Sequence, residues 1–234
     1  MAERRLSPDE LLTTTRSTRR HLDLTRPVDV AVLRDCVAIA LQAGHVGTME
    51  MGVGDPPPSP PGIRSRAHFV VVTDPARRAA LAALYRRALA LGAPGRERVL
   101  AGLRAEGGPR AAAAIEVVAA TDQLAERLDR VPVHVVPCIA WRASERLPVV
   151  SQASLWGSIF PAVWSFLLAA RARGLGGIVT TAHLQYEREA AEVLGIPHEA
   201  VTQAALIPLA HVAEGTFEPG PPPRLDAALH LDGW

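Results

Sequence analysis

The residues between Thr13 and Arg20 have the strongest potential for chemistry in this chain. Their sequence, Thr-Thr-Thr-Arg-Ser-Thr-Arg-Arg, combines three guanidinium groups with several hydroxyl groups. On a helix, Arg16, Arg19 and Arg20 would lie at positions i, i+3 and i+4 and would share one face. A planar, permanently charged guanidinium suits a phosphate dianion, and the hydroxyl of Ser17 adds another donor. The segment therefore predicts an anion site, while a solvated basic turn is the simpler alternative.

Composition narrows the class of protein. The chain has 234 residues and a formal net charge of +1, and hydrophobic residues make up 48% of it. These values permit one large domain or two small ones, and they give no support to a partner that is nucleic acid or a membrane surface. All 25 basic residues are Arg, and the chain contains neither Lys nor Asn. Schiff-base chemistry on Lys and any role for an Asn side chain are therefore excluded.

Signals for metal binding and for targeting are weak. Cys36 and Cys138 do not form a Cys-x-x-Cys pair, and the eight histidines are scattered, so the sequence predicts no metal site. The charged residues at the N-terminus are not followed by the apolar run of a secretory signal. No stretch approaches the roughly 20 apolar residues expected of a membrane span. These features predict a cytoplasmic protein.

Hydrophobic periodicity predicts a mixture of long helices and separated strands. The expected helices cover residues 30–43, a stretch from Pro75 onward, the end of 92–130 after a loop, 159–173, and 186–195. The expected strands cover 69–73, 131–140 and 204–210. The prolines of the second strand favour an edge position or irregular pairing. Asp29 and Asp74 are placed to cap the first two helices. Together these elements predict an α+β domain.

Two segments are expected to be irregular. Residues 44–67 lack useful periodicity and contain five prolines in a short span, so they predict a loop. A rebuilt lid and a local shift of reading frame both explain this abrupt change of composition. Residues 218–234 start with a proline-rich run and predict an extended C-terminal tail. Apart from these segments, residues 1–234 are expected to form a single domain.

The order of the motifs resembles that of the FMN-dependent nitroreductase family. The segment around Arg16 is similar to the family's Arg-Arg-Ser-x-Arg motif, and the ending His230–Trp234 is similar to an actinobacterial branch. The other stretches that carry the resemblance are Phe69–Asp74 (first strand), Phe160–Gly176 (central helix and glycine turn), Leu194–Pro197 and Ile207–Leu209 (closing elements). The resemblance covers nearly the whole chain, and the order and spacing of the motifs make it specific.

The resemblance implies a central, mostly antiparallel sheet flanked by helices, in an intertwined homodimer that holds FMN at its interface. It also implies an oxidoreductase that takes a hydride from NAD(P)H and then reduces a nitroaromatic, a quinone or a similar electron-poor small molecule in a ping-pong reaction. The flavin carries the hydride chemistry, so no catalytic side chain is expected.

The resemblance also implies where the cofactor binds. The implied cofactor-binding residues are Arg16, Ser17, Arg19, Thr180, Thr181 and Arg224. Arg16, Ser17 and Arg19 would hold the FMN phosphate and the polar edge of the flavin. Thr180 and Thr181 would face the flavin through backbone N–H groups, and Arg224 remains from a pair of C-terminal arginines.

The chain departs from the family pattern where relatives contact the flavin. The family's Pro-Ser/Thr-Gly-x-Asn-x-Gln segment is missing, and the 44–67 loop takes its place. Trp164 and Ser165 replace a Gln-Asn pair, and prolines precede Arg224 where the family branch has a second Arg. These departures favour an alternative, a degenerate non-enzymatic dimer of the same fold that binds flavin or is structural. A third hypothesis is that the fold carries another reaction, such as reductive dehalogenation or flavin destruction. Analogy of fold does not distinguish this hypothesis from the NAD(P)H oxidoreductase.

Overall fold

A five-stranded sheet lies at the centre of the computed structural model, which describes residues 6–43, 65–144, 146–212, 217–220 and 224–234. The helices are α1 (Pro8–Thr14), α2 (Val30–Ala40), α3 (Pro75–Leu91), α4 (Ala93–Glu106), α5 (Gly108–Arg127), α6 (Val149–Arg171) and α7 (Glu187–Leu194). The strands are β1 (Ala67–Val72), β2 (Val133–Ile139), β3 (Leu175–Gly177), β4 (Thr202–Gln203) and β5 (Ile207–His211). Short 3₁₀ turns are η1 (Leu128–Arg130), η2 (Ala182–Tyr186) and η3 (Leu225–Ala227).

The strands lie in the order β1-β2-β5-β3, and β4 pairs with the end of β2. Each strand pairing in the described part of the chain is antiparallel. The register places Phe69 opposite Pro137 between β1 and β2, and Gly177 opposite Leu209 between β3 and β5. The predicted α+β class, with a mostly antiparallel sheet flanked by helices, is confirmed.

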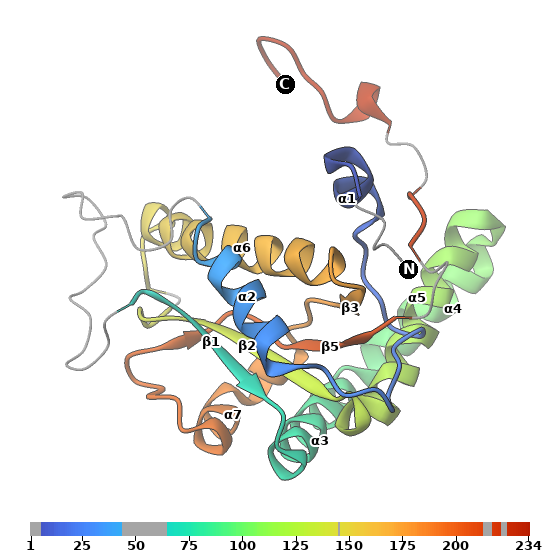
Figure 1. Cartoon of the computed structure of the whole chain (residues 1–234). Helices are drawn as coiled ribbons and strands as arrows, with labels where there is room; N and C mark the ends of the chain where they lie inside the picture. The colour runs from blue at the N-terminus through green and yellow to red at the C-terminus, as the bar shows by residue number, and fades with distance from the viewer. Residues whose placement is uncertain (1–5, 44–64, 145, 213–216, 221–223) are drawn as a thin grey trace.

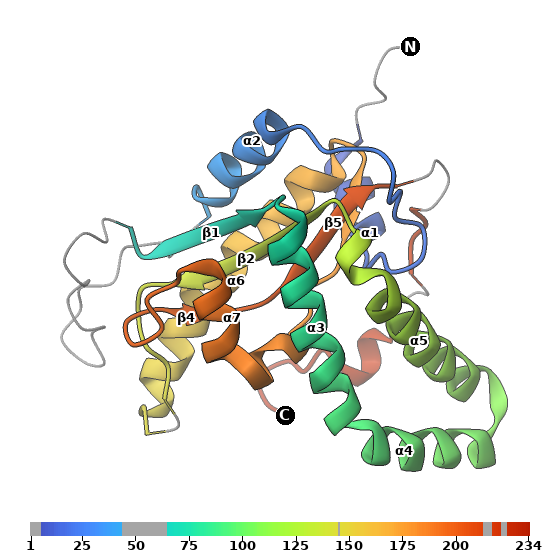
Figure 2. The same ribbon diagram turned by 90° about the horizontal axis from the view of Figure 1, so that it is seen from below.

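Helices cover both faces of the sheet (Figures 1 and 2). On one face, α2 and α6 pack against side chains that include Val133, Val135 and Leu209. On the other face, α3, α7 and the end of α5 pack against side chains that include Val136 and Cys138. Successive side chains of a strand point to opposite faces, so β2 contributes to both cores and is buried along its whole length.

The position of β2 corrects a prediction. The prolines of this strand predicted an edge or irregular position, yet β2 has β1 on one side and β5 and β4 on the other. Pro137 falls between the residues of β2 that pair with β5 and those that pair with β4. Its carbonyl accepts a hydrogen bond from the N–H of Ala204. The sheet needs no N–H donor at this gap, so a central strand tolerates the proline here.

Two helical regions extend beyond the residues that periodicity predicted. α4 begins at Ala93, where a loop was expected. Gly107 and Gly108 separate α4 from α5 with φ angles of 65° and 81°, which glycine adopts without steric cost.

α6 begins at Val149, well before the expected residue 159, and continues through Pro161. A proline usually marks a helix boundary, which explains why the earlier turns were missed.

Other boundaries follow the local chemistry that the sequence predicts. Asp29 accepts a hydrogen bond from the N–H of Ala31, and Asp74 accepts one from the N–H of Arg77, so both caps are confirmed. The predicted irregular segment falls mainly on residues 44–64, which lie outside the described residues. From Arg224 onward the C-terminal tail is exposed and contains the turn η3, and Figure 1 shows this part reaching away from the sheet.

α6 is the central helix of the fold. By length and composition it could cross a membrane, so the expectation that no stretch approaches such a span is wrong. One helix of this kind is a weak indication, because a buried core helix has the same composition. Here α6 packs against α2, β2 and β3 and buries residues such as Leu155 and Phe166, as a core helix does.

Glycines permit a close approach of backbones at β3. A Cβ atom on Gly177 would lie 2.7 Å from the carbonyl oxygen of Pro208 on β5. A Cβ atom on Gly176 would collide with Val212 and would lie 3.0 Å from the hydroxyl of Thr18. The N-terminal segment, β3 and β5 therefore meet in a space that admits no side chain.

We predict that Gly177→Ala lowers the free energy of unfolding by about 1–3 kcal/mol, because a backbone carbonyl cannot move away as a flexible side chain can. Gly102→Ala in α4 is the matched control, since a Cβ atom there meets nothing within 4 Å. It should instead raise stability by about 0.5–1 kcal/mol through helix propensity. Urea unfolding checks both changes, and equal effects of the two substitutions would contradict the close approach at β3.

Two histidines are buried as neutral rings. Burial lowers the pKa of His134 to about 4, against the opposing effect of the carbonyl of Leu128, which lies 2.9 Å from its Nε2. Burial also lowers the pKa of His183 to about 4, and the carboxylate of Glu187 only partly offsets this. In the unfolded chain both rings titrate near 6.5. Between these values the unfolded chain binds protons that the folded chain does not.

Stability should therefore be constant above about pH 6.5 and should fall as the pH drops toward 4. If both rings take up a proton on unfolding, the free energy of unfolding changes with pH by at most about 2.7 kcal/mol per pH unit. Urea unfolding at pH 7.5, 6 and 5 measures this slope, and His134→Gln with His183→Gln should flatten it even if the double variant is less stable. A wild-type free energy that does not change across this range would show that both rings titrate normally.

Candidate functional site

The arginine-containing segment is extended, not helical. α1 ends at Thr14, and the N–H of Thr18 donates to the carbonyl of Gly177 over 3.0 Å, which joins the segment to the edge of the sheet. An isolated bridge between Leu22 and Val212 fixes the chain a few residues further on. The prediction that Arg16, Arg19 and Arg20 share a helix face is therefore wrong, because pairing with β3 replaces helical hydrogen bonding.

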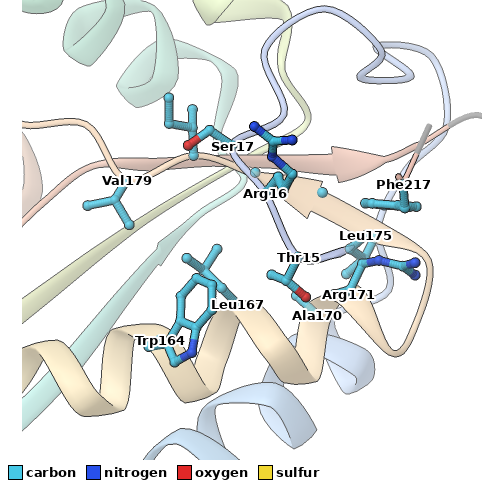
Figure 3. Close-up of a pocket in the computed structure, with 13 residues that line it drawn as sticks. Thr15, Arg16, Ser17, Trp164, Leu167, Ala170, Arg171, Leu175, Val179 and Phe217 are labelled. Atoms are coloured by element: carbon cyan, nitrogen blue, oxygen red, sulfur yellow. The ribbon is translucent and has the colours of Figure 1, made fainter. Parts of the chain in front are cut away.

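A pocket opens between this segment, α6 and β3 (Figure 3). Its lining residues are Thr15, Arg16, Ser17, Trp164, Leu167, Ala170, Arg171, Leu175, Gly176, Gly177, Ile178, Val179 and Phe217. Its volume of about 90 Å³ is small. Arg16 and Arg171 supply positive charge, while the rest of the wall is mainly apolar, including Trp164, Leu167 and Val179. We call this space the segment–α6 pocket.

Arg171 is a half-buried cation at one end of the segment–α6 pocket. Its guanidinium lies 3.5 Å from the ring centroid of Phe217 and donates to the hydroxyl of Thr14 over 3.3 Å. Burial lowers its pKa, and the charge of Glu10 acts weakly in the opposite direction. Its Nε is buried and has no hydrogen-bond partner within the described residues. A desolvated guanidinium with a free donor is suited to an anion.

Arg16 is the second cation of the pocket. It forms no ion pair with any acidic residue in the part of the chain that the structure describes, and Gly220 packs against its guanidinium. The hydroxyl of Ser17 lies on the same wall in Figure 3. The structure therefore brings together two of the expected site residues, Arg16 and Ser17, and adds Arg171 to them.

Arg19 lies outside the segment–α6 pocket and lines a neighbouring cavity. Burial lowers its pKa, with Tyr85 opposing, and its Nε has no hydrogen-bond partner within the described ranges. The carbonyl of Arg19 accepts a hydrogen bond from the guanidinium of Arg127 over 3.1 Å. Arg16 and Ser17 line this cavity as well as the segment–α6 pocket, so the neighbouring cavity brings the expected group of Arg16, Ser17 and Arg19 together.

The remaining expected residues lie elsewhere. The N–H of Thr180 donates to the carbonyl of Leu206, and its hydroxyl donates to that of Tyr85, so this N–H is already used within the fold. Thr181 lines a separate open cleft between α3 and η2. The side chain of Arg224 is 82% exposed and pairs with Asp226.

Sequence reasoning missed Arg171, Trp164 and Phe217. A usable signal was present for the first two, because Trp164, Leu167 and Arg171 lie at i, i+3 and i+7 on α6 and so share one face. The contribution of Phe217 had no signal in the sequence, since it depends on how the chain returns to α6 after β5.

Comparison with known proteins agrees with this fold. The model of the nitroreductase family matches residues 12–211, and the chain belongs to that family. None of the curated protein sequences matches it.

Several solved structures share the fold at low sequence identity. The FMN and NADPH-dependent nitroreductase NfnB from Sphigopyxis sp. strain HMH is 20% identical, with a TM-score of 0.60 and coverage of 98% of this chain and 100% of that one. The nitroreductase-like protein from Bacillus cereus is 14% identical, with a TM-score of 0.60 and coverage of 97% of both chains. An iodotyrosine deiodinase bound to FMN and 3-iodo-L-tyrosine is 16% identical, with a TM-score of 0.58 and coverage of 97% and 99%. The shared fold thus hosts more than one reaction.

Proposed function

We propose that this protein is an FMN-dependent NAD(P)H oxidoreductase that reduces nitroaromatics, quinones or similar electron-poor small molecules by a ping-pong mechanism. The observation that carries the proposal is the segment–α6 pocket of a nitroreductase-family chain, in which Arg16 and Arg171 adjoin an apolar wall and form no ion pair within the described residues. When bound, FMN would accept a hydride from the nicotinamide and pass two electrons to the acceptor. We place the protein in the cytoplasm.

The residues present fit the phosphate end of FMN. Arg16, Ser17 and Arg171 offer charged and hydroxyl donors, and the buried Nε of Arg171 lacks a partner within the described residues. Phe217 stacks on the guanidinium of Arg171 and holds its plane in place. A pocket of about 90 Å³ accommodates a phosphate group but is far below the several hundred Å³ typical of a whole cofactor site.

The flavin ring would therefore lie on the open, apolar side of the pocket. Trp164 and Val179 face this side in Figure 3. The wall excludes water from one face of the ring, while the arginines fix the phosphate and so orient the ring. Arg19, Thr181 and Arg224 remain proposed contacts for the flavin edge beyond the pocket, and Thr180 can contribute there by packing.

A second copy of the chain would close the open side. α6 exposes large apolar side chains along its length, with Trp164 at the pocket 42% exposed, Phe160 one turn earlier 38% exposed and Val149 at the far end of the helix 82% exposed. Ile39 on α2 is also exposed. Exposed large apolar side chains are often found at interfaces between protein chains. This exposure supports the proposed homodimer, in which each FMN site is completed at the interface.

The alternative is a non-enzymatic descendant of the family that keeps the fold. Two observations favour it: the absence of Asn from the chain and the small volume of the segment–α6 pocket. Reduction of bound flavin by NADPH or NADH under anaerobic conditions, followed by reoxidation with a nitroaromatic, separates the two hypotheses. Bound flavin that neither nicotinamide reduces would support the alternative, and a purified protein that takes up no FMN would overturn the leading proposal.

We predict that Arg171→Gln weakens FMN binding by about 10- to 100-fold, because a charge-assisted hydrogen bond contributes about 1.5–3 kcal/mol. Fluorescence titration with FMN and with riboflavin measures the effect, and riboflavin affinity should change little because riboflavin lacks the phosphate. Arg173→Gln is the matched control, since Arg173 belongs to the same helical end but bonds the carbonyl of Ala169 outside the pocket. Equal losses for FMN and riboflavin would show that Arg171 does not bind the phosphate.

We also predict that Arg16→Ala combined with Arg19→Ala abolishes FMN retention while the chain stays folded. Both guanidiniums are free of acidic partners within the described residues, so their removal breaks no ion pair there. Flavin absorbance per chain after purification is the measurement, and circular dichroism with gel filtration checks folding and assembly. Normal flavin content in the double variant would place the phosphate elsewhere.

A further inference from the structure

We propose that the cavity between β1, β2 and the C-terminal end of α7 binds a small monocyclic phenol. Its lining residues are His68 and Val70 of β1, Cys138 of β2 and five residues of the stretch 194–201. Its volume is about 210 Å³. None of its lining residues belongs to the segment–α6 pocket, so this site is independent of the proposed function. We call it the α7 cavity.

The α7 cavity lies on the face of the sheet that α3 and α7 cover. Val70, Cys138 and Leu194 belong to the hydrophobic core on that face or pack against it. α6, which forms one wall of the segment–α6 pocket, packs on the opposite face. Figure 1 shows α7 on one side of β1 and β2 and α6 on the other side. The sheet therefore separates the α7 cavity from the proposed flavin site.

Backbone hydrogen bonds fix the wall of the cavity that follows α7. Gly195 ends the helix with a φ of 70°, and the N–H of Ile196 donates to the carbonyl of Ala191 over 2.9 Å. The N–H of Val201 donates to the carbonyl of Pro197 over 3.0 Å. These bonds use polar backbone groups of the wall within the fold. The cavity is therefore preformed, as sites for small molecules usually are.

The lining of the α7 cavity favours an apolar ring. Five of its side chains are aliphatic: Val70, Leu194, Ile196, Pro197 and Val201. Burial raises the pKa of the Cys138 thiol to about 12, so this group stays uncharged. The described lining residues include no arginine, so an anion finds no opposite charge there. An apolar cavity of about 150 Å³ holds benzene. The α7 cavity is somewhat larger and has room for one aromatic ring with a substituent.

His68 supplies the polar contact that distinguishes a phenol from a hydrocarbon. Its Nε2 lies 2.7 Å from the carbonyl oxygen of Ser65. A carbonyl oxygen only accepts hydrogen bonds, so in the neutral ring Nε2 carries the proton and Nδ1 is an acceptor. The ring of His68 is half-buried in the lining of the cavity. A phenol whose ring packs among the aliphatic side chains would donate its O–H to Nδ1.

Titration of the FMN-saturated protein with phenol and with toluene, followed by two-dimensional NMR, tests the proposal. Phenol should bind with a Kd on the order of 1 mM, as expected for a ligand with few atoms. The backbone signals that shift should belong to residues 68–70, Cys138 and 194–201. His68→Phe should weaken phenol binding by about two- to tenfold, because it removes one hydrogen bond, and should leave toluene affinity unchanged.

Val70→Phe and Val71→Phe form a matched pair on β1. Both valines are half-buried, but Val70 lines the α7 cavity, whereas Val71 packs against the core on the opposite face. Val70→Phe fills the cavity and should weaken the binding of phenol and of toluene by at least about tenfold. Val71→Phe should bind both ligands like the wild type. If Val70→Phe does not fold, as circular dichroism would show, His68→Phe decides alone.

Three results would overturn the proposal. The first is a wild-type protein whose signals do not shift with phenol up to about 10 mM, ten times the expected Kd. The second is a set of shifts confined to the segment–α6 pocket, which would place the phenol at the flavin site. The third is a His68→Phe variant that binds phenol like the wild type. If the protein takes up no FMN, the proposed function fails, and the same titration of the flavin-free chain still decides on the α7 cavity.

Discussion

The close approach of three stretches of backbone at Gly176 and Gly177 is the constraint on which the site depends. β3 lies against β5 there, and Thr18 of the N-terminal segment bonds the carbonyl of Gly177. A side chain at either glycine would separate these stretches. This contact holds residues 15–18 in a non-helical form, and the chain bends at Arg19 and Arg20. Arg16 consequently lines both the segment–α6 pocket and the neighbouring cavity, whereas Arg19 and Arg20 line only the latter.

Uncompensated positive charge is the second organising feature. Arg16, Arg19 and Arg171 form no ion pair within the described residues, and burial lowers the pKa of Arg19 and of Arg171. Partial burial of a guanidinium costs free energy unless hydrogen bonds or an opposite charge offset the loss of water. Phe217 and Thr14 provide part of that compensation to Arg171. A bound anion would provide the rest, which connects the energetics of the fold to the proposed chemistry.

The two-sided burial of the sheet explains why the site is located at its edge. β2 is covered on both faces, and α6 fills one face with apolar side chains along its length. The interior therefore has little room for a large polar ligand. At the end of α6, by contrast, the helix meets β3 and the N-terminal segment, so charged side chains can reach solvent from partly buried positions. This location also places the pocket beside the exposed apolar surface of α6 that a second chain could cover.

Much of the fold could be read from the sequence. Asp29 and Asp74 mark helix starts because their side chains accept hydrogen bonds from nearby N–H groups, and such local interactions depend little on distant residues. The start of α6 could not be read in this way, because packing of its first turns against the core outweighs the boundary signal of Pro161. The central place of β2 was also hidden, since the gap between its partners β5 and β4 is defined only by strands far away in the chain.

The sequence by itself determined the class of the domain and the presence of an arginine-rich segment near the N-terminus, and it predicted Arg16 and Ser17 as residues of an anion site there. These properties follow from the types of the residues and from their order along the chain. Only the tertiary structure decided that Arg16 shares its pocket with Arg171, that Arg19 faces α5, and that the N–H of Thr180 is already bonded within the fold. The physical reason is that strand pairing at β3 sets the direction of each side chain, and this pairing joins residues that are far apart in the sequence.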